Sequence, residues 1–407
     1  MMKTRSVYIC DAVRTPHGGF FGSLKDIPSA KLGASVIKKL LERNKVPPAA
    51  VGGVFMGEVF TAGEGQNPAR QAVLQGGLPL TCPAETVNKV CASSLAALRN
   101  ATRAIQLGET ELMIAGGMEN MSRSPYFMRR KQKALGNRTV DVLVSPSHGD
   151  PDVLYDSMLY DGLTDPLLSE VKRQHMGDLA DLCAYVHSIS REEQDLFSHV
   201  SVARAHDARR KGFSALQLFE MSPPGVPALL DDEVLRLPNL SAVRKLRPVF
   251  SETGTVTAGT SSQIADGASA LLISSGKEAK ELSLTPIARI CDFAVFSGHF
   301  SWYTTAPVGA IKLLLEKTRR TISNIDLFEI NEAFAVVPLY AMKEFSLPHE
   351  KVNVWGGAIA IGHPLGASGT RIVGALAHQL RALGEKTGIA VACNGGGEAV
   401  AVLIERV

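Results

Sequence analysis

Short apolar runs alternate along the chain with stretches in which apolar residues recur at helical spacing. The runs are apolar almost throughout, as expected of strands that helices cover on both faces. Alternation of this kind favours an α/β fold over an α+β fold. The sequence predicts strands at residues 7–10, 54–56, 112–115, 270–273, 327–330, 389–392 and 400–403.

Two stretches look like one helix–strand unit used twice. Residues 91–94 open a helical run with one apolar face, and the strand that follows ends at residues 116–119. Residues 366–369 open a second such run, whose strand ends at residues 395–398. Similar units recur in many α/β proteins, so the pattern indicates an internal duplication without establishing it.

The segment between the two units differs from them in amino-acid composition. Charged residues are denser there, and prolines cluster between residues 223 and 238. We interpret it as an inserted subdomain of loops and a few helices. Ser190 and Glu193 have the spacing of a capping box, which predicts a helix that runs on toward Ala208. The predicted domains are residues 1–121 (completed by about 249–275), the insertion 122–248, and residues 276–407.

Composition excludes several classes of protein. With 407 residues, 45% apolar and 20% charged, the chain is long enough for two or three domains and too apolar to be disordered. A net charge of +3 does not predict a nucleic-acid binder. No apolar run approaches the ~20 residues that span a bilayer, so no membrane partner is expected. A strand-like run begins at residue 7, so no cleavable leader is expected.

The six cysteines lie far apart and form no CxxC pair. In a chain of this size, that spacing argues against a disulfide scaffold and against a metal site built on zinc. The default interpretation is a cytoplasmic protein with reduced thiols.

Cys91 is the first candidate for chemistry, because it precedes small residues at a predicted helix start. Backbone N–H groups and the helix dipole at such a position favour a thiolate, which is a strong nucleophile. The alternative is a small buried thiol, which is the common fate of a free cysteine.

Cys393 is the second candidate, because it ends a predicted strand and enters a run of three glycines that begins at Gly395. Ligands of open α/β sheets bind beyond the carboxyl ends of strands. Consecutive glycines let the backbone approach a ligand and direct N–H groups at an anion. Taken alone, the glycine run is equally typical of a tight turn.

A histidine and an asparagine complete the set of candidates. His363 stands before a proline in a glycine-rich loop, which suits a positioned base that titrates near neutral pH. Asn331 and Glu332 follow a predicted strand, where an amide could hold a water or orient a histidine. An isolated histidine is more often structural, and Asn331 on its own is typical of a helix N-cap.

Together these features resemble the thiolase family, and more closely its acetyl-CoA acetyltransferase branch, along nearly the whole chain. Six ordered matches with the spacing of the family make the resemblance specific. The matching segments are residues 90–94, 116–122, 254–259, 331–334, 362–364 and 393–395.

The resemblance implies roles for the candidate residues. Cys91 matches the nucleophile that takes the acyl group, and His363 matches the histidine that activates it. Cys393 matches the acid/base that removes a proton from the second acetyl-CoA. One oxyanion hole is implied at His363 and a water held by Asn331, and the other at the backbone N–H groups of Cys91 and Gly395.

The resemblance also implies contacts with coenzyme A, whose thioesters are the substrates; no metal and no redox cofactor is required. A basic run at residues 244–247 lies where the nucleotide phosphates could emerge, although exposed basic residues are usually only solvated. The implied contacts of the pantetheine arm and tunnel are Ser262, His175, Met176, Ala258, Ala333 and Phe334.

The fold implied by the resemblance has two similar α/β halves stacked as five layers, α-β-α-β-α, with the loop subdomain over the active site. Family members are dimers or dimers of dimers, so a homodimer or homotetramer is expected. Four features depart from the family pattern and leave acyl-chain preference and oligomer size open: Trp355, residues 260–263, Ala242 and the long segment 123–160.

The leading functional prediction is an acyltransferase that condenses two acetyl-CoA molecules into acetoacetyl-CoA, or catalyses the reverse. Within the same class, a 3-ketoacyl-CoA thiolase of longer chain specificity is the close alternative. A decarboxylating ketoacyl synthase shares the duplicated fold and a cysteine nucleophile, but the second cysteine favours a thiolase. A non-catalytic acyl-CoA binding protein is the remaining alternative, and the presence of all four reactive side chains argues against it.

Overall fold

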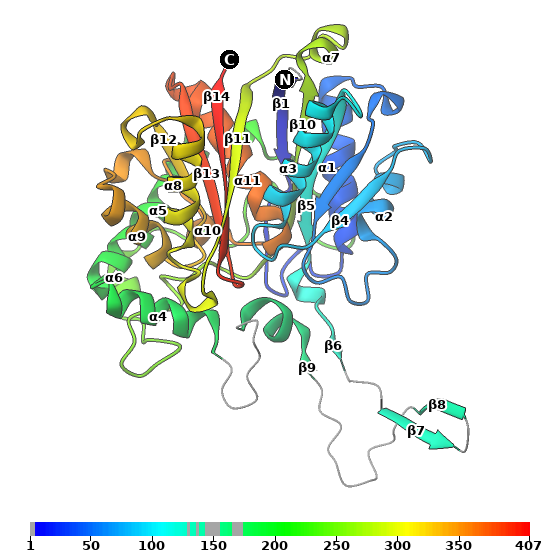
Figure 1. Cartoon of the computed structure of the whole chain (residues 1–407). Helices are drawn as coiled ribbons and strands as arrows, with labels where there is room; N and C mark the ends of the chain where they lie inside the picture. The colour runs from blue at the N-terminus through cyan, green and yellow to red at the C-terminus, as the bar shows by residue number, and fades with distance from the viewer. Residues whose placement is uncertain (1–4, 128–130, 136–137, 143–154, 165–173) are drawn as a thin grey trace.

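The computed structural model describes residues 5–127, 131–135, 138–142, 155–164 and 174–407. Its centre is a ten-stranded sheet that contains every strand predicted from the apolar runs (Figure 1). The main path of this sheet has the order β4(Ala84–Val87), β3(Val54–Gly57), β5(Leu112–Glu119), β10(Ala265–Ser275), β1(Val7–Arg14), β11(Ala288–Ser297), β14(Glu398–Arg406), β13(Thr387–Asn394) and β12(Leu327–Ile330); β2(Gly18–Gly19) pairs with β10.

The register of the sheet reveals two similar halves. β3 runs parallel to β5, which pairs antiparallel with β10, and β12, β13 and β14 repeat this arrangement. β1 and β11 each carry a bulge beside a Cys-Asp pair, Cys10-Asp11 in one half and Cys291-Asp292 in the other. The two halves meet where residues 7–9 pair antiparallel with residues 288–290. The predicted duplication is therefore visible strand by strand.

Helices form three layers around the two halves of the sheet, as the cores between them show. α3(Ser93–Leu107) and α11(Ser368–Leu383) contact each other and pack into one apolar core with strands of both halves. Separate cores cover the two outer faces of the sheet. The five-layer α/β architecture is confirmed. The outer helices are α1(Ser29–Asn44), α2(Pro68–Gln75) and α7(Gly276–Glu281) on the N-terminal half, and α8(Ala306–Thr318) and α9(Val336–Phe345) on the C-terminal half.

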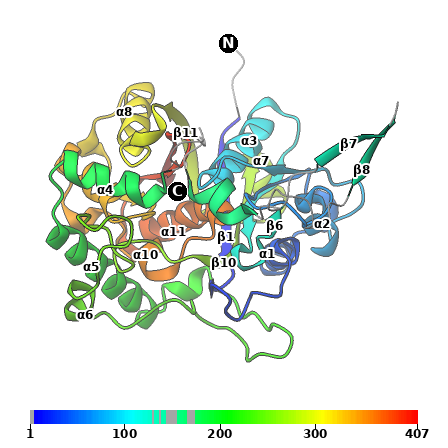
Figure 2. The same ribbon diagram turned by 90° about the horizontal axis from the view of Figure 1, so that it is seen from below.

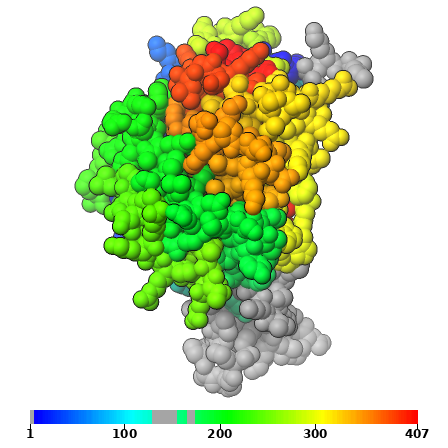
Figure 3. Space-filling view, turned by 90° about the vertical axis from the view of Figure 1, so that its left-hand side faces the viewer, coloured from blue at the N-terminus to red at the C-terminus, as the bar shows by residue number. Residues whose placement is uncertain are grey.

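The inserted segment contains both helices and short strands. α4(Met176–Val186), α5(Arg191–Arg210) and α6(Leu240–Arg244) gather beside the C-terminal half, as Figures 2 and 3 show. The predicted capping box is present: the Glu193 N–H donates to Ser190 Oγ at 3.2 Å, and the Ser190 N–H donates to Glu193 Oε2 at 2.6 Å. The short strands are β6(Tyr126–Phe127), β7(Lys131–Leu135), β8(Arg138–Val142) and β9(Tyr155–Asp156).

Part of the long segment 123–160 lies outside the described residues.

None of the helices in the described ranges combines the length and apolar character needed to cross a lipid bilayer. The domain boundaries, the oligomeric state and the cellular location inferred from the sequence stay predictions.

Candidate active site

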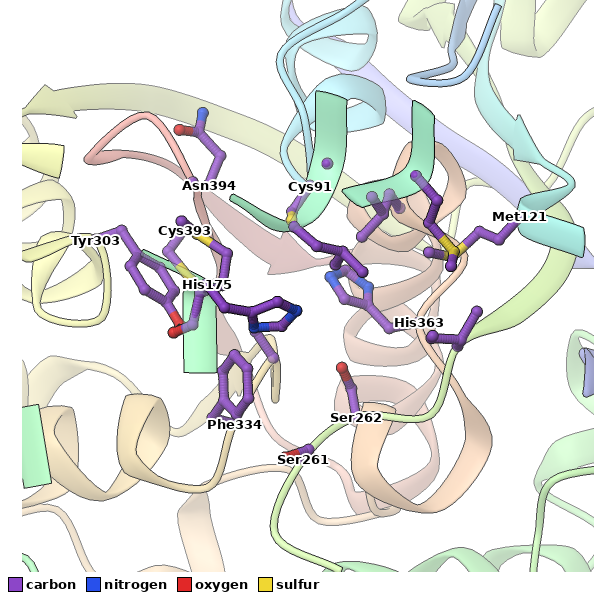
Figure 4. A pocket seen from close by; sticks show the side chains of 18 of the residues that line it. Cys91, Met121, His175, Ser261, Ser262, Tyr303, Phe334, His363, Cys393 and Asn394 are labelled. Atoms are coloured by element: carbon purple, nitrogen blue, oxygen red, sulfur yellow. The ribbon is translucent and has the colours of Figure 1, made fainter. Parts of the chain in front are cut away.

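A cavity of about 310 Å³ brings the three reactive side chains together (Figure 4). Cys91, His363 and Cys393 all line it, although they come from opposite halves of the chain. Most of the remaining wall is apolar, which is typical of a site that binds an organic ligand with few fixed polar contacts. Further lining residues are Met121, Met158, Leu159, Gly162, Leu163, His175, Met176, Phe250, Ser261, Ser262, Gln263, Ile264, Tyr303, Ala333, Phe334, Leu365, Asn394 and Gly395.

Cys91 is presented by a strained turn between β4 and α3. Val90 has φ +49°, a conformation in which a β-branched residue is a rare outlier, and such strain concentrates at functional sites. The Ser93 hydroxyl holds the turn, because it accepts from the Lys89 N–H at 2.8 Å and donates to the Val90 carbonyl at 2.5 Å. The helix begins at Ser93. The predicted position of Cys91 at a helix start is therefore confirmed.

Cys393 is held by the last pairs of the β13–β14 hairpin, where it faces Ala399 across the ladder. Asn394 closes the glycine turn, since its side-chain oxygen accepts from the Gly396 N–H at 2.9 Å and its carbonyl accepts from the Gly397 N–H at 3.1 Å. Gly397 has φ +82°, which a residue with a side chain would adopt only under strain. Gly395 lines the cavity beside Cys393.

His363 follows α10(Ala358–Ile361), and its tautomer can be read from its neighbours. The Ser368 hydroxyl donates its one proton to the Pro364 carbonyl at 2.9 Å, so it accepts from His363 Nδ1 at 2.5 Å. Nδ1 therefore carries the proton. Nε2 keeps its lone pair and accepts from the Asn331 side-chain amide at 3.3 Å. A neutral imidazole whose Nε2 carries no proton is suited to act as a base.

Two further contacts fix this imidazole and its partner. Arg371, which is buried, donates to Asn331 Oδ1 at 3.4 Å and thereby orients the amide toward His363. The ring of His17 lies 2.7 Å (Nδ1 to oxygen) from the carbonyl of Ile361, two residues before His363. Burial, together with the nearby charge of Arg371 and the His17 ring, lowers the pKa of His363 to about 3. The imidazole is therefore neutral in the resting protein.

The resting thiols are also neutral, and here the expectation from the sequence is wrong. Burial, with a smaller contribution from the negative charge of Glu119, raises the pKa of Cys91 to about 12. Burial also raises the pKa of Cys393, and Cys91 nearby raises it further. The helix start does not give a stable thiolate, because the dense protein around Cys91 outweighs the helix dipole. Cys91 therefore has to lose its proton to a base during the reaction.

Most of the residues expected near coenzyme A reach the cavity. Ser262, Met176, Ala333 and Phe334 line it, as does His175, whose Nδ1 accepts from the Gly177 N–H at 3.0 Å at the start of α4. The His175 ring stacks on Phe250 with centroids 4.7 Å apart.

One expected residue lies outside the cavity. Ala258 does not line this cavity; it is exposed, in a turn that the Thr260 N–H closes onto the Thr257 carbonyl at 3.1 Å. Arg244 pairs with Glu192 at 2.9 Å on the surface. Single-residue matches to a family pattern do not report which way a turn faces.

Sequence reasoning missed several residues of the site. Tyr303 is buried in the wall beside the two thiols and donates to the Met176 carbonyl at 2.9 Å, but nothing in its local sequence signals this. Ser368 could have been identified from the sequence. Its hydroxyl stands five residues after His363, just beyond a Pro-Leu-Gly sequence that is typical of a helix start. Trp355, a departure from the family, stacks on Phe213 with centroids 4.8 Å apart and does not touch the cavity.

Comparisons with known proteins agree along the whole chain. Residues 7–277 match the model of the thiolase N-terminal domain, and residues 284–406 match that of the thiolase C-terminal domain. The chain belongs to the thiolase family. This thiolase is 41% identical over 407 residues to a probable acetyl-CoA acyltransferase of Staphylococcus aureus (strain COL), covering 98% of this chain and 99% of the relative.

Solved thiolase structures share its fold. The acetyl-CoA acetyltransferase of Bacillus anthracis is 34% identical with a TM-score of 0.91, and each chain is covered in full. Human mitochondrial 3-ketoacyl-CoA thiolase is 36% identical with a TM-score of 0.91, covering 99% of both chains. A thiolase of Ascaris suum in complex with coenzyme A is 35% identical with a TM-score of 0.88, covering 99% of this chain and 100% of the other. The protein is thus an acyltransferase of the thiolase type.

Proposed function

We propose that this thiolase condenses two molecules of acetyl-CoA into acetoacetyl-CoA and coenzyme A, and that it catalyses the reverse reaction. The observation that carries the proposal is the meeting of two thiols and one neutral imidazole in a single cavity. Coenzyme A thioesters are the only ligands that the proposed reaction requires; it uses no metal and no redox group.

In the first half-reaction, Cys91 Sγ attacks the thioester carbonyl of acetyl-CoA and passes its proton to His363 Nε2. The carbon–sulfur bond to coenzyme A breaks, and Cys393 gives its proton to the departing thiolate. The products are acetyl-Cys91, free coenzyme A, a protonated His363 and a Cys393 thiolate. Formation of a covalent intermediate divides one difficult exchange into two easier steps.

In the second half-reaction, the Cys393 thiolate removes a proton from the methyl carbon of a second acetyl-CoA. The resulting carbanion forms a carbon–carbon bond with the carbonyl of acetyl-Cys91. The bond from that carbonyl to Cys91 Sγ breaks, and His363 returns its proton to the sulfur. All groups regain their resting protonation states. Negative charge on the two thioester oxygens is stabilised by His363 with a water held by Asn331, and by the N–H groups of Cys91 and Gly395.

A second candidate, a 3-ketoacyl-CoA thiolase for longer chains, is favoured by the wall of the cavity next to Cys91. This wall consists of apolar side chains that pack as one cluster with Cys91. Burial of each additional methylene against such a wall stabilises a bound chain by about 0.8 kcal/mol. The residues of this wall that also line the cavity are Met121, Met158, Leu163, Ile264 and Leu365.

Steady-state thiolysis of 3-oxoacyl-CoA substrates of increasing length separates the two candidates. For the acetyl-specific proposal, kcat/KM is highest with acetoacetyl-CoA and falls with every added pair of carbons. An increase of kcat/KM with chain length would assign the longer-chain activity instead. Absence of thiolysis with every chain length would contradict both.

A further inference from the structure

The two reactive cysteines belong to different halves of the chain, so their separation depends on contacts across the boundary. Cys91 stands on the turn after β4, and Cys393 stands in the hairpin β13–β14. A misplacement of reacting groups by about 1 Å can lower a rate by about two orders of magnitude. Whatever holds the turn against the hairpin therefore controls the step that needs both thiols.

One group of polar residues joins the turn to the hairpin beside the cavity. Lys89 Nζ donates to Glu398 Oε2 at 2.6 Å, across 309 positions of the sequence. The Asn394 side-chain amide donates to the Lys89 carbonyl at 3.1 Å and to Glu398 Oε2 at 3.3 Å. The Ser297 hydroxyl, at the end of β11, donates to Glu398 Oε1 at 3.1 Å. Lys89 is thus held through both its side chain and its carbonyl, and Glu398 is held through its carboxylate.

Both charged residues lie very near the thiols along the chain. Lys89 is two residues before Cys91, in the turn that Ser93 closes. Glu398 pairs with Asn394 at the base of the glycine turn, one register position beyond Cys393. Lys89 lies close to Cys91, and the residue that pairs with Glu398 adjoins Cys393, so a shift of the ion pair should also displace the two thiols.

The pair differs from an ordinary surface ion pair in its surroundings. The exposed fractions of the two side chains are 25% for Lys89 and 27% for Glu398, so solvent screens their attraction only in part. Burial disfavours the charged form of Glu398, but hydrogen bonds from Lys89 and Asn394 outweigh it and hold the pKa of Glu398 below its usual value. Neither residue lines the cavity, so neither touches the reacting atoms.

We propose that Lys89 and Glu398 are positioning residues, which clamp the turn of Cys91 to the hairpin of Cys393 and set the separation of the two thiols. The proposal rests on the proposed function only for the order of the half-reactions. Both half-reactions use Cys393, but they depend on it to different degrees. In acylation Cys393 only protonates the departing coenzyme A, and a thiolate can leave without that proton because thiols titrate near pH ~8.5. Carbon–carbon bond formation has no substitute for the Cys393 thiolate, which has to lie at the correct distance to act as the base. Loss of the clamp should therefore harm condensation more than acylation.

A double-mutant cycle tests the clamp. Lys89→Met and Glu398→Gln should each lower kcat for condensation on the order of tenfold, with KM changed less than about twofold. Acetylation of Cys91 in a single turnover, followed by mass spectrometry of the protein, should stay within about twofold of the wild type. The double variant should be no slower than the slower single variant, because one interaction is lost in all three.

Two controls define the result. Lys89→Arg keeps the charge and should recover most of the lost kcat. Lys312→Met breaks a pair with the same 2.6 Å distance, Lys312 to Glu344 on α8 and α9, and should leave kcat unchanged. Additive losses in the double variant, or acetylation slowed as much as condensation, would overturn the clamp.

A measurement without substrate separates failure of the clamp from failure of the proposed function. A short reagent that alkylates two thiols, such as dibromobimane, should bridge Cys91 to Cys393 in the wild type because both line one cavity, and the bridged product is fluorescent. Glu398→Gln should lower the ratio of bridged to singly alkylated product severalfold, and so should Lys89→Met, which tests the same point if the first variant folds poorly. An unchanged ratio in both variants would refute the clamp, whichever acyl-CoA the enzyme uses.

Discussion

Glu58 carries a buried carboxyl group whose replacement should stabilise the protein at high pH. Glu58 directly follows β3, and its side chain is fully buried. Its Oε1 is hydrogen-bonded to the Ser29 hydroxyl, whereas Oε2 has no partner in the described part of the chain. Burial, with a further contribution from the charge of Glu119, raises the pKa of Glu58 from 4.5 to about 9. A protonated Glu58 can donate to Ser29, whose hydroxyl then donates to Glu64 at 3.1 Å.

The sign and size of the effect follow from these two pKa values. Between pH 4.5 and pH 9 the folded protein keeps a proton on Glu58 that the unfolded chain has released, so stability falls as pH rises through this window. Each pH unit costs about 1.4 kcal/mol. From pH 5 to pH 8 the wild type should therefore lose about 4 kcal/mol relative to Glu58→Gln, whose amide can still donate to Ser29.

Guanidinium-induced unfolding of both proteins at pH 5, 6, 7 and 8 measures this difference. Glu58→Gln should match the wild type near pH 5 and become progressively more stable, with kcat unchanged at pH 7. Glu85→Gln, at an exposed glutamate on β4, is the matched control and should show no such trend. If the advantage of Glu58→Gln is the same at every pH, Glu58 is ionised in the folded protein and the reasoning is refuted.

Three further substitutions test the surroundings of the imidazole. Asn331→Ala should lower kcat by about 10²–10³ with little change in KM, because it removes the amide beside Nε2; a rise in KM alone would contradict this. Ser368→Ala removes the acceptor of the Nδ1 proton and should lower kcat about tenfold or more, which steady-state kinetics would detect; an unchanged kcat would show that the tautomer is held otherwise. His17→Phe removes the contact with the Ile361 carbonyl and should lower kcat per active site, with the active sites counted by burst kinetics. His17→Asn, which can still form a hydrogen bond, should retain more of the wild-type kcat. Equal losses of kcat in the two variants would refute a role for the hydrogen bond.

The parts of the site that could be predicted from the sequence are those fixed by local pattern. Apolar runs locate the strands, and the local pattern places Cys91 between β4 and the start of α3 and Cys393 at the end of β13. The capping box of Ser190 and the histidine of the glycine-rich loop are likewise readable, because a few neighbouring residues determine them.

The parts that could not be predicted depend on residues far apart in the chain. The neutral state of Cys91 follows from the mass of protein packed around it, which a helix-start pattern does not report. The pair of Lys89 with Glu398 joins positions 309 residues apart, and Glu58 meets Glu119 only after β3 and β5 pair. Ala258 is the opposite case, a residue that the sequence predicted but the structure does not place in the site. It matches the family pattern, but its turn leaves it outside the cavity.

The central claim is that Cys91 carries the acyl group while Cys393 moves the proton of the second substrate. The most direct measurement uses Cys393→Ser with acetyl-CoA labelled in its acetyl group, quenched with acid, digested and analysed by mass spectrometry, with acetoacetyl-CoA assayed in the same sample. The account predicts label on the peptide of Cys91 and no acetoacetyl-CoA. Label absent from Cys91, or acetoacetyl-CoA formed at the wild-type rate, would contradict it.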